Sequence, residues 1–208
     1  MRAITPYFAI ESRIDGQEIL KQIELAGRTA YKSEDRITNN SAEKFVKMII
    51  DRGHLSVIEH YSVTVRIICD RGVSHEIVRH RLASYTQEST RYCNYTKGKF
   101  GNEITVIKPC FWDDNDEKYL VWKQAIEQAE KSYNKLIELG AKPQEARSIL
   151  PNSLKTEIVM TMNLREWHHF FILRTSKAAH PQMREIAIQL LKEFRKKIPV
   201  VFDEINIE

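Results

Sequence analysis

Apolar residues recur at helical spacing in several parts of the chain. In the longest run, over 115–139, Trp122, Ile126 and Tyr133 fall on one face, and Gly140 follows the last turn. A glycine at this point is typical of a helix end, because it tolerates the left-handed backbone conformation. The same reasoning predicts further helices over 18–30, from 40 to 53, over 143–150, from 163 to 174 and over 181–194.

Two stretches alternate between apolar and polar residues and therefore predict half-buried strands. In 60–69, Val63 and Ile67 share the apolar face, and 154–163 alternates in the same way. A third, short strand fits 103–108. The strands and helices do not alternate regularly, which favours an α+β fold over a doubly wound one. We expect a central, mostly antiparallel sheet flanked by helices.

Three polar residues are predicted to begin helices. Asn40 and Asn163 are each followed three residues later by a glutamate, which is the spacing of a capping box. Ser74 is expected to cap a short helix after a turn at 70–72. In the helix that follows Asn40, the side chains expected to face inward are Phe45, Met48 and Ile49.

Composition indicates a soluble globular protein. The 208 residues are 42% hydrophobic and 29% charged, and one domain over 1–208 is the simplest interpretation. The chain shows no signal-peptide pattern and no apolar window of membrane-spanning length, so we expect a cytoplasmic protein without membrane association. Three cysteines without a CxxC pair indicate neither a disulfide scaffold nor a zinc knuckle.

Residues 79–92 carry the most informative chemistry. Arg79, Arg81 and Arg91 lie there among hydroxyl and amide side chains, with Glu88 as the single acid. Guanidinium groups match phosphate oxygens two at a time, and hydroxyls donate to the remaining lone pairs. The segment therefore predicts a ligand with a phosphate and a polar ring. The net charge of +4 suits such an anion and does not require nucleic acid.

Common nucleotide and metal motifs are missing from the sequence. The seven glycines form neither GxGxxG nor GxxxxGK, so a nucleotide must be held without a Rossmann fingerprint or a P-loop. His75 and His80 are separated by five positions and would point about 140° apart on a helix. No metal site is predicted from this pair.

Four blocks of the sequence combine charged, polar and turn-forming residues in fixed patterns. They are RHR-x7-S over 79–89, GHxS with EH over 53–60, ARxxLP over 146–151 and NxR with LR over 163–174. These blocks resemble those of the flavin-dependent thymidylate synthases, and they keep the order and spacing of that family over most of the chain. Leu164 and Glu166 depart from the pattern, because they replace smaller residues of a NARS-like segment.

The resemblance implies an enzyme of dTMP biosynthesis that methylates dUMP reductively. Its flavin would be FAD, with methylenetetrahydrofolate as the carbon donor and NADPH as the reductant. The resemblance also implies a homotetramer with active sites where subunits meet. Its partners would be these small molecules and further copies of the chain, without nucleic acid.

The matched blocks also imply three sets of site residues. Arg174 would be catalytic, favouring loss of the uracil N3 proton by stabilising the developing anion. Glu76 would meet a sugar hydroxyl or orient Arg79. The residues implied to bind dUMP are Glu76, Arg79, Gln87, Glu88, Ser89, Thr90, Arg91, Arg147 and Arg174. Those implied to bind FAD are Ser56, Arg79, His80, Arg81, Gln87, Asn163, Leu164, Arg165 and His169, with His54 a further candidate beside the ring.

Two side chains raise the alternative of covalent catalysis. Ser89 has no obvious histidine base in the sequence, and serine is a poor nucleophile without one. Cys93 lies beyond the matched motif. In the family, the flavin is understood to deliver hydride to the pyrimidine without an enzyme nucleophile. We therefore interpret Ser89 as a binding residue and Cys93 as a small buried residue.

Other functions remain open. A basic loop interleaved with Tyr85, Tyr92 and Tyr95 could stack on single-stranded nucleic acid. That alternative leaves the separate blocks around Arg147 and Arg174 unexplained. A second alternative is a flavin- and nucleotide-binding protein without synthase activity. An α+β domain without any ligand is the third.

Overall fold

The computed structural model describes residues 1–96, 98, 101 and 103–207. These residues divide into two compact units. One of the points where the chain passes from the first unit to the second is between Arg79 and His80. This point lies inside residues 79–92, called the arginine-rich segment below. The first unit consists of Met1–Tyr7, Ile67–Arg79 and Thr86–Val159. The second consists of Phe8–Arg66, His80–Tyr85 and Met160–Glu208.

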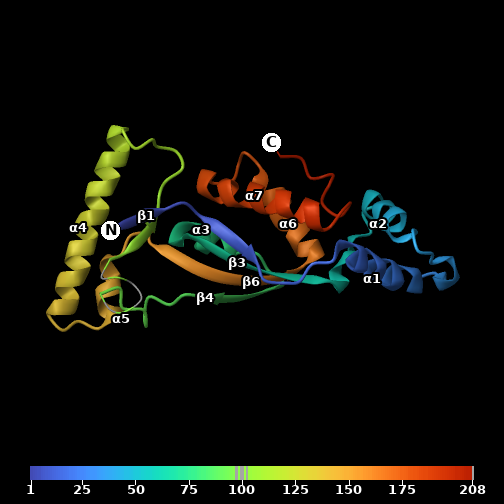
Figure 1. Cartoon of the computed structure of the whole chain (residues 1–208), viewed down its shortest axis with the longest axis horizontal. Helices are drawn as coiled ribbons and strands as arrows, with labels where there is room; N and C mark the ends of the chain where they lie inside the picture. The colour runs from blue at the N-terminus through green and yellow to red at the C-terminus, as the bar shows by residue number, and fades with distance from the viewer. Residues whose placement is uncertain (97, 99–100, 102, 208) are drawn as a thin grey trace. The chain divides into compact units, whose positions relative to one another are not determined.

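A four-stranded sheet with the strand order β2-β3-β6-β4 confirms the expected α+β fold (Figure 1). Two contacts show that β3 and β6 run antiparallel. The Leu164 N–H donates to the Tyr61 carbonyl at 2.9 Å, and the hydroxyl oxygens of Thr64 and Thr161 are 2.9 Å apart. Residue numbers in β6 therefore fall as those of their partners in β3 rise, which is the register of antiparallel strands. The strands are β2 (Tyr7–Ile10), β3 (Ser62–Asp70), β4 (Ala83–Gln87) and β6 (Lys155–Asn163).

The two longest strands have the burial pattern that their sequences predict. In β3, Val63, Val65 and Ile67 are fully buried. In β6, Ile158 and Met160 are buried and the residues between buried positions are half-buried. One face of each strand therefore forms the core, as a period of two requires.

Four helices belong to the second unit, and they pack as two pairs, α1 with α2 and α6 with α7 (Figure 1). In the second pair, Trp167 stacks on Phe171, and both rings contact Phe194. The Trp167 indole N–H donates to the Val63 carbonyl at 3.1 Å, which ties α6 to β3. The helices are α1 (Gly16–Thr29), α2 (Ala42–Asp51), α6 (Leu164–Thr175) and α7 (Pro181–Lys197), and the 3-10 helix η2 (Leu55–His60) follows α2.

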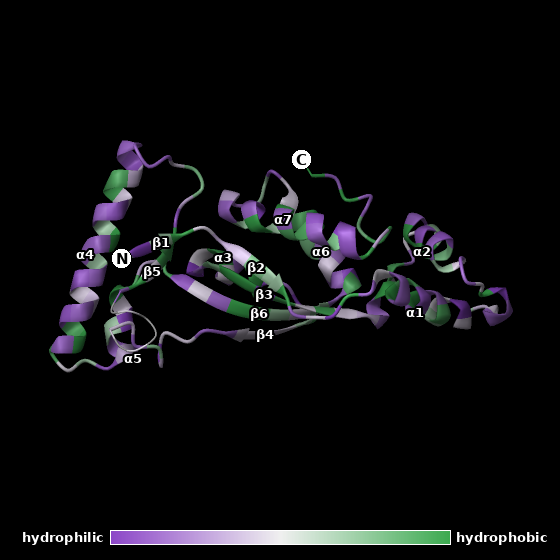
Figure 2. Ribbon diagram, viewed as in Figure 1, coloured by the Kyte–Doolittle hydropathy of each residue, from purple (hydrophilic) through white to green (hydrophobic). Residues whose placement is uncertain are grey.

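The first unit has its own apolar cluster, formed by Tyr133, Val106 and Leu154 with their neighbours. Helix α4 alternates apolar and polar patches along its length, as Figure 2 shows, and Gly140 with φ +92° follows it as expected. No helix among the described residues combines the length and the apolar character needed to cross a membrane. The elements are β1 (Arg2–Ile4), which pairs in parallel with β5 (Thr105–Ile107), and α3 (Arg71–Ile77), α4 (Glu117–Glu138), α5 (Pro143–Ala146) and the 3-10 helix η4 (Arg147–Ile149).

The expected start and inward face of α2 are wrong in detail. The residue before the helix is Ser41, not Asn40, and its hydroxyl contacts the buried carboxylate of Glu24 at 2.8 Å. Met48 is exposed and Phe45 is half-buried. The buried stripe instead consists of Ala42, Val46, Ile49 and Ile50, so the face that packs inward is rotated from the expected one.

The expected turn at 70–72 is also wrong, because α3 begins directly after β3. The Asp70 carboxylate accepts the Val73 N–H at 2.7 Å and so caps the helix. Ser74 lies inside the helix, fully buried, and its hydroxyl donates to the Arg71 carbonyl at 2.9 Å. At the start of α6, the expected Asn163 cap is confirmed.

Strand β4 was not predicted, since 83–87 was interpreted as part of a polar loop. Its residues alternate between half-buried and exposed positions, and it lies at the end of the sheet order, next to β6. An edge strand has one partner and a solvated side, so its sequence can be polar throughout. The apolar pattern that reveals inner strands is absent there.

Removing a core side chain from α7 tests whether this helix packs its apolar face into the core of the second unit. Leu191 is fully buried, so Leu191→Ala is expected to lower the free energy of unfolding by about 2–5 kcal/mol. Leu120 is also helical but 53% exposed. Leu120→Ala is therefore expected to change stability by less than about 0.5 kcal/mol. Urea denaturation at one protein concentration measures both, and equal losses would contradict the core described here.

Candidate active site

In the first unit, the loop after β4 lies beside the segment that carries Arg147. The Arg147 Nη1 donates to the Thr90 hydroxyl at 3.4 Å, and the Arg91 Nε donates to the Gln144 amide oxygen at 3.2 Å. Both guanidinium groups are exposed to solvent. Two cations from separate sequence blocks therefore lie at one surface, where they can bind phosphate together.

The side chain of Gln87 is oriented by two buried hydroxyls. Its Nε2 donates to Ser74 Oγ at 2.9 Å and to Thr156 Oγ1 at 3.1 Å. The Ser74 hydroxyl uses its own hydrogen toward the Arg71 carbonyl, so it accepts from the amide. The amide oxygen is consequently the group that Gln87 can offer to a ligand.

The carboxylate of Glu88 is engaged inside the first unit. It accepts from the Lys155 ammonium at 2.7 Å and from the Tyr95 hydroxyl at 3.2 Å. Burial, and then the charge of Glu88, raise the pKa of Tyr95, which therefore remains a donor. These bonds anchor the start of the loop, and the Glu88 N–H adds a bond to the Glu157 carbonyl at 2.8 Å.

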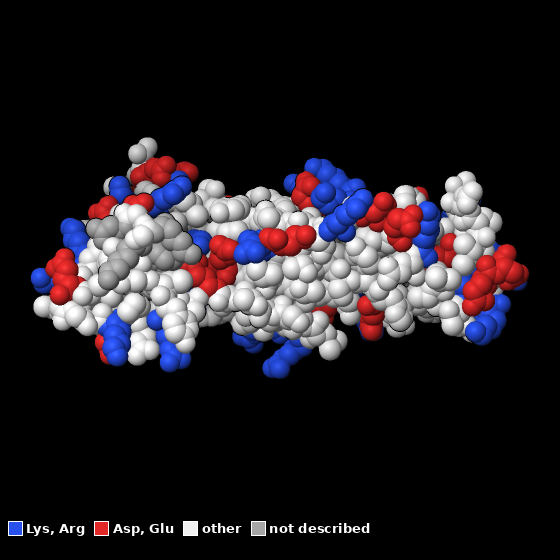
Figure 3. Space-filling view, turned by 60° about the horizontal axis from the view of Figure 1, so that its bottom comes forward, with Lys and Arg blue, Asp and Glu red and all other residues white. Residues whose placement is uncertain are grey.

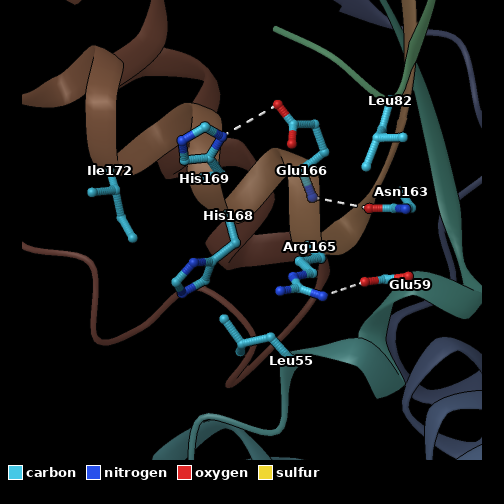
Figure 4. Close-up of a pocket in the computed structure, with 9 residues that line it drawn as sticks. All are labelled: Leu55, Glu59, Leu82, Asn163, Arg165, Glu166, His168, His169 and Ile172. Carbon is cyan, nitrogen blue, oxygen red and sulfur yellow. Dashed lines mark hydrogen bonds and ion pairs between the residues drawn. The ribbon is translucent and has the colours of Figure 1, made fainter.

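In the second unit, a cavity of about 490 Å³ lies beside the first turns of α6 (Figure 4). It combines apolar side chains with an amide, a guanidinium and imidazoles. Three of the residues implied to bind FAD line it. The lining residues are Leu55, Glu59, Leu82, Asn163, Arg165, Glu166, His168, His169 and Ile172.

The polar part of the cavity holds one guanidinium and two carboxylates, because Glu59 and Glu166 line it together with Arg165. Asn163 uses its amide oxygen to cap α6 by accepting the Glu166 N–H at 2.9 Å. Arg165 is paired with Glu59, and the two side chains meet at the cavity wall (Figure 4). The positive end of the 12-residue helix α6 adds to the guanidinium charge. With the apolar Leu55 nearby, the cavity can take a ligand that combines polar groups with an apolar ring.

His80 connects the arginine-rich segment to α6. Its ring is almost fully buried, with Nδ1 3.1 Å from Glu166 Oε1 and Nε2 accepting the Arg174 Nε–H at 3.0 Å. An arginine Nε can only donate, so the ring proton must lie on Nδ1 and point at Glu166. Phe170 packs edge-on against the ring at 4.9 Å between centroids.

Burial keeps this imidazole neutral. Desolvation lowers the pKa of His80 and the Arg174 cation acts in the same direction, while the bond to Glu166 opposes them. Burial and the Glu166 charge raise the pKa of Tyr85 to about 12, and its hydroxyl donates to the His80 carbonyl at 2.8 Å. A guanidinium fixed in this way can stabilise an anion that develops on a bound ring.

Cys69, Cys93 and Ser89 do not have the environment of activated nucleophiles. Cys69 is buried, and this burial raises the pKa of its thiol, which therefore stays protonated. Cys93 packs against the apolar cluster of the first unit but is only half-buried, so the expectation of a buried residue is wrong in this respect. The Ser89 hydroxyl oxygen accepts the Arg91 N–H at 3.3 Å.

The other implied residues lie on exposed or half-buried segments of the two units. Glu76 is half-buried in α3, and its carbonyl accepts the Arg79 N–H at 3.3 Å. Leu164 is fully buried and can contribute only its backbone to a ligand. The exposed residues are His54 and Ser56, on either side of Leu55, and Arg79 and Arg81, on either side of His80.

The structure brings the implied residues together in two groups. In the first unit, Thr90 and Arg91 meet the segment of Arg147. In the second, His80 lies with His169 and Arg174. Sequence reasoning missed Glu166, which contacts His80, although its departure from the family pattern was a signal. It also missed Gln144 and Lys155, for which no sequence signal existed.

Charges of both signs are interspersed on the face that Figure 3 shows. Among the described residues on that face, lysines and arginines do not merge into one large basic patch. Non-specific nucleic-acid binding depends on such a patch. This face gives no support to the nucleic-acid alternative.

Comparisons with known proteins place the chain in a family. Residues 14–200 match the family model described as thymidylate synthase complementing protein. The chain is 38% identical to a flavin-dependent thymidylate synthase of Pyrococcus furiosus over 172 residues, covering 82% of this chain and 70% of that protein. It is 32% identical to one of Geobacter sulfurreducens, covering 86% and 79%.

A solved structure has the same fold. The crystal structure of the UMP/dUMP methylase PolB from Streptomyces cacaoi, bound with 5-Br dUMP, matches with a TM-score of 0.78. The match covers 98% of this chain and 96% of that one at 22% identity. At this identity the likeness establishes the fold, whereas the two synthases establish the family. The chain belongs to the flavin-dependent thymidylate synthases.

Proposed function

We propose that this protein catalyses the FAD-dependent reductive methylation of dUMP to dTMP. Methylenetetrahydrofolate would donate the carbon and NADPH the reducing equivalents. The position of Arg174 carries the proposal. Its guanidinium is held by a buried, neutral imidazole, and such a fixed cation is what a ring must have nearby to lose a proton from N3.

The first unit supplies all the groups that we assign to the nucleotide except Arg174, which belongs to the second unit. dUMP brings a phosphate of roughly −1.5 to −2 charges near neutral pH. Arg91 and Arg147 are close enough to share it, and the Gln87 amide oxygen can accept from the pyrimidine or the sugar. The carboxylate of Glu88 is engaged by Lys155 and Tyr95, and its N–H by Glu157. Glu88 would therefore serve the nucleotide by holding the loop in place or through its own carbonyl. The full set we assign to dUMP is Glu76, Arg79, Gln87, Glu88, Ser89, Thr90, Arg91, Arg147 and Arg174.

The cavity beside α6 supplies three of the groups that we assign to FAD, namely Asn163, Arg165 and His169. When bound, the flavin supplies the hydride. The protein's own residues bind and orient it: Arg165 and the start of α6 face anionic groups, and Leu55 and Ile172 face apolar ones. The full set we assign to FAD is His54, Ser56, Arg79, His80, Arg81, Gln87, Asn163, Leu164, Arg165 and His169.

The assembly and location belong to the same proposal. We propose a single synthase domain over 1–208 that acts in the cytoplasm as a homotetramer. Residues of neighbouring copies would then complete each active site. The +4 charge and the apolar core are those of a protein that stays in solution.

A visible spectrum with added substrates tests the function. We expect a yellow protein that NADPH bleaches and that forms dTMP only with dUMP and methylenetetrahydrofolate. A bleached protein that never forms dTMP would identify a flavoprotein without synthase activity. A colourless protein that binds polynucleotide with steep salt dependence would instead support single-stranded nucleic-acid binding.

Removing the guanidinium of Arg174 tests its catalytic role. Arg174→Ala is expected to fold and keep its flavin, but to lose most dTMP formation, by roughly 100-fold or more in kcat. Exposed Arg36 is the matched control, and Arg36→Ala is expected to behave like the wild type. Wild-type turnover in Arg174→Ala would defeat the assignment.

Removing Arg147 tests the nucleotide site of the first unit. A charge-assisted bond contributes about 1.5–3 kcal/mol, so Arg147→Ala is expected to raise the KM for dUMP by roughly 10- to 100-fold. Flavin content should not change. Lys142, an exposed cation at the start of α5, is the control. If Lys142→Ala and Arg147→Ala have equal KM values, Arg147 does not bind the phosphate.

Removing a thiol tests the mechanism without an enzyme nucleophile. Cys93→Ala deletes a sulfur that packs against the apolar cluster, so we expect slightly lower stability and wild-type turnover. Steady-state kinetics with saturating dUMP measures this. Lost turnover with normal flavin and dUMP binding would show that the thiol is a nucleophile.

A further inference from the structure

We propose that Glu166 is a positioning residue that acts through His80 to hold the guanidinium of Arg174 in one orientation. The inference rests on the proposed function, because it assumes that Arg174 serves the reacting pyrimidine. In this role Glu166 acts through the His80 ring.

The contacts form a continuous chain inside the second unit. Glu166 lies in the first turn of α6 and Arg174 in its last turn, eight residues later. His80 spans the distance between them, with bonds of 3.1 Å to Glu166 and 3.0 Å to Arg174. The exposed fraction is 2% for the His80 side chain and 12% for that of Glu166, so water competes little for either bond.

The donor and acceptor of each bond in this series of contacts are determined. Arg174 donates to Nε2, so Nδ1 carries the proton and must have an acceptor. The Glu166 carboxylate is that acceptor. If the acceptor is removed, a buried N–H remains unsatisfied and the ring is free to adopt the other tautomer or to turn. In either case Nε2 ceases to be a fixed acceptor for Arg174.

A metal site is the competing interpretation of the same residues. Ligand atoms of His80, Glu166 and His169 lie within 4.8 Å of one another. A metal on His80 Nδ1 would require a lone pair there and would move the proton to Nε2. Two donors, Nε2–H and Arg174 Nε–H, would then face each other. The observed bond to Arg174 therefore favours the hydrogen-bonded chain.

The same geometry predicts how pH acts. The groups that face His80 are Glu166, His169 and Arg174 from α6, and the Tyr85 hydroxyl, which binds its carbonyl. When His80 gains a second proton, Nε2 cannot accept from Arg174. Burial has lowered the pKa of His80, so this loss occurs below the usual histidine range as pH falls.

The first test removes the acceptor. Glu166→Ala is expected to lower kcat per bound flavin by roughly 100-fold, as a small misplacement of a catalytic group does, with the KM for dUMP near that of the wild type. Glu204→Gln is the matched control. It alters another glutamate–histidine pair, in which Glu204 contacts His168 of the same helix at 2.7 Å, and it should leave kcat unchanged.

The second test keeps an acceptor and removes the charge. Glu166→Gln can still accept the Nδ1 proton, so it should retain most of the wild-type kcat at neutral pH. The carboxylate raises the pKa of His80, so without it the acid limb of the kcat profile should move to lower pH. A purely structural role would leave that limb in place.

The outcomes separate this inference from the proposed function. If the wild type forms no dTMP, the function itself is wrong. If the wild type is active and Glu166→Ala matches it in kcat, only the positioning role is wrong. An acid limb that stays fixed in Glu166→Gln would also overturn it. So would zinc binding to the wild type that Glu166→Gln abolishes, because that would establish a metal site instead.

Discussion

A buried, neutral imidazole placed between a carboxylate and a guanidinium is the constraint on which the candidate site depends. His80 comes from the arginine-rich segment, and both of its partners come from α6. Because the ring is buried, neither bond can be replaced cheaply by water. The two bonds therefore hold His80 against α6, and the bond from Nε also holds the Arg174 guanidinium in one orientation.

Helix α6 contributes side chains both to the core and to the site. The residue at which it starts determines which of its faces points to the core and which to the site. Asn163 ends β6 and caps the helix, so the phase of every later residue is determined there. Trp167 and Phe171 face the aromatic core, while Arg165 and His169 face the cavity. This double use explains why the helix has no simple amphipathic stripe.

The long elements could be predicted from the sequence because apolar periodicity, helix-breaking glycines and helix-capping side chains are local signals. This holds for α4 with Gly140 and for the buried face of β6. Errors arose where tertiary contacts override local preference. Ser41 replaced Asn40 before α2 because its hydroxyl meets the buried Glu24. Strand β4 was not predicted because an edge strand can be polar on both faces.

The sequence by itself determined which kind of ligand the protein needs, since guanidinium groups, hydroxyls and the absence of a glycine-rich loop are properties of composition and spacing. It also determined the family, through blocks that keep their order. Only the tertiary structure decided how these groups are used. It directs the Glu88 carboxylate to Lys155, orients the Gln87 amide, and places Glu166 against His80. Such pairings join residues far apart in the chain, and their hydrogen-bond directions depend on burial and on distances that no local pattern encodes.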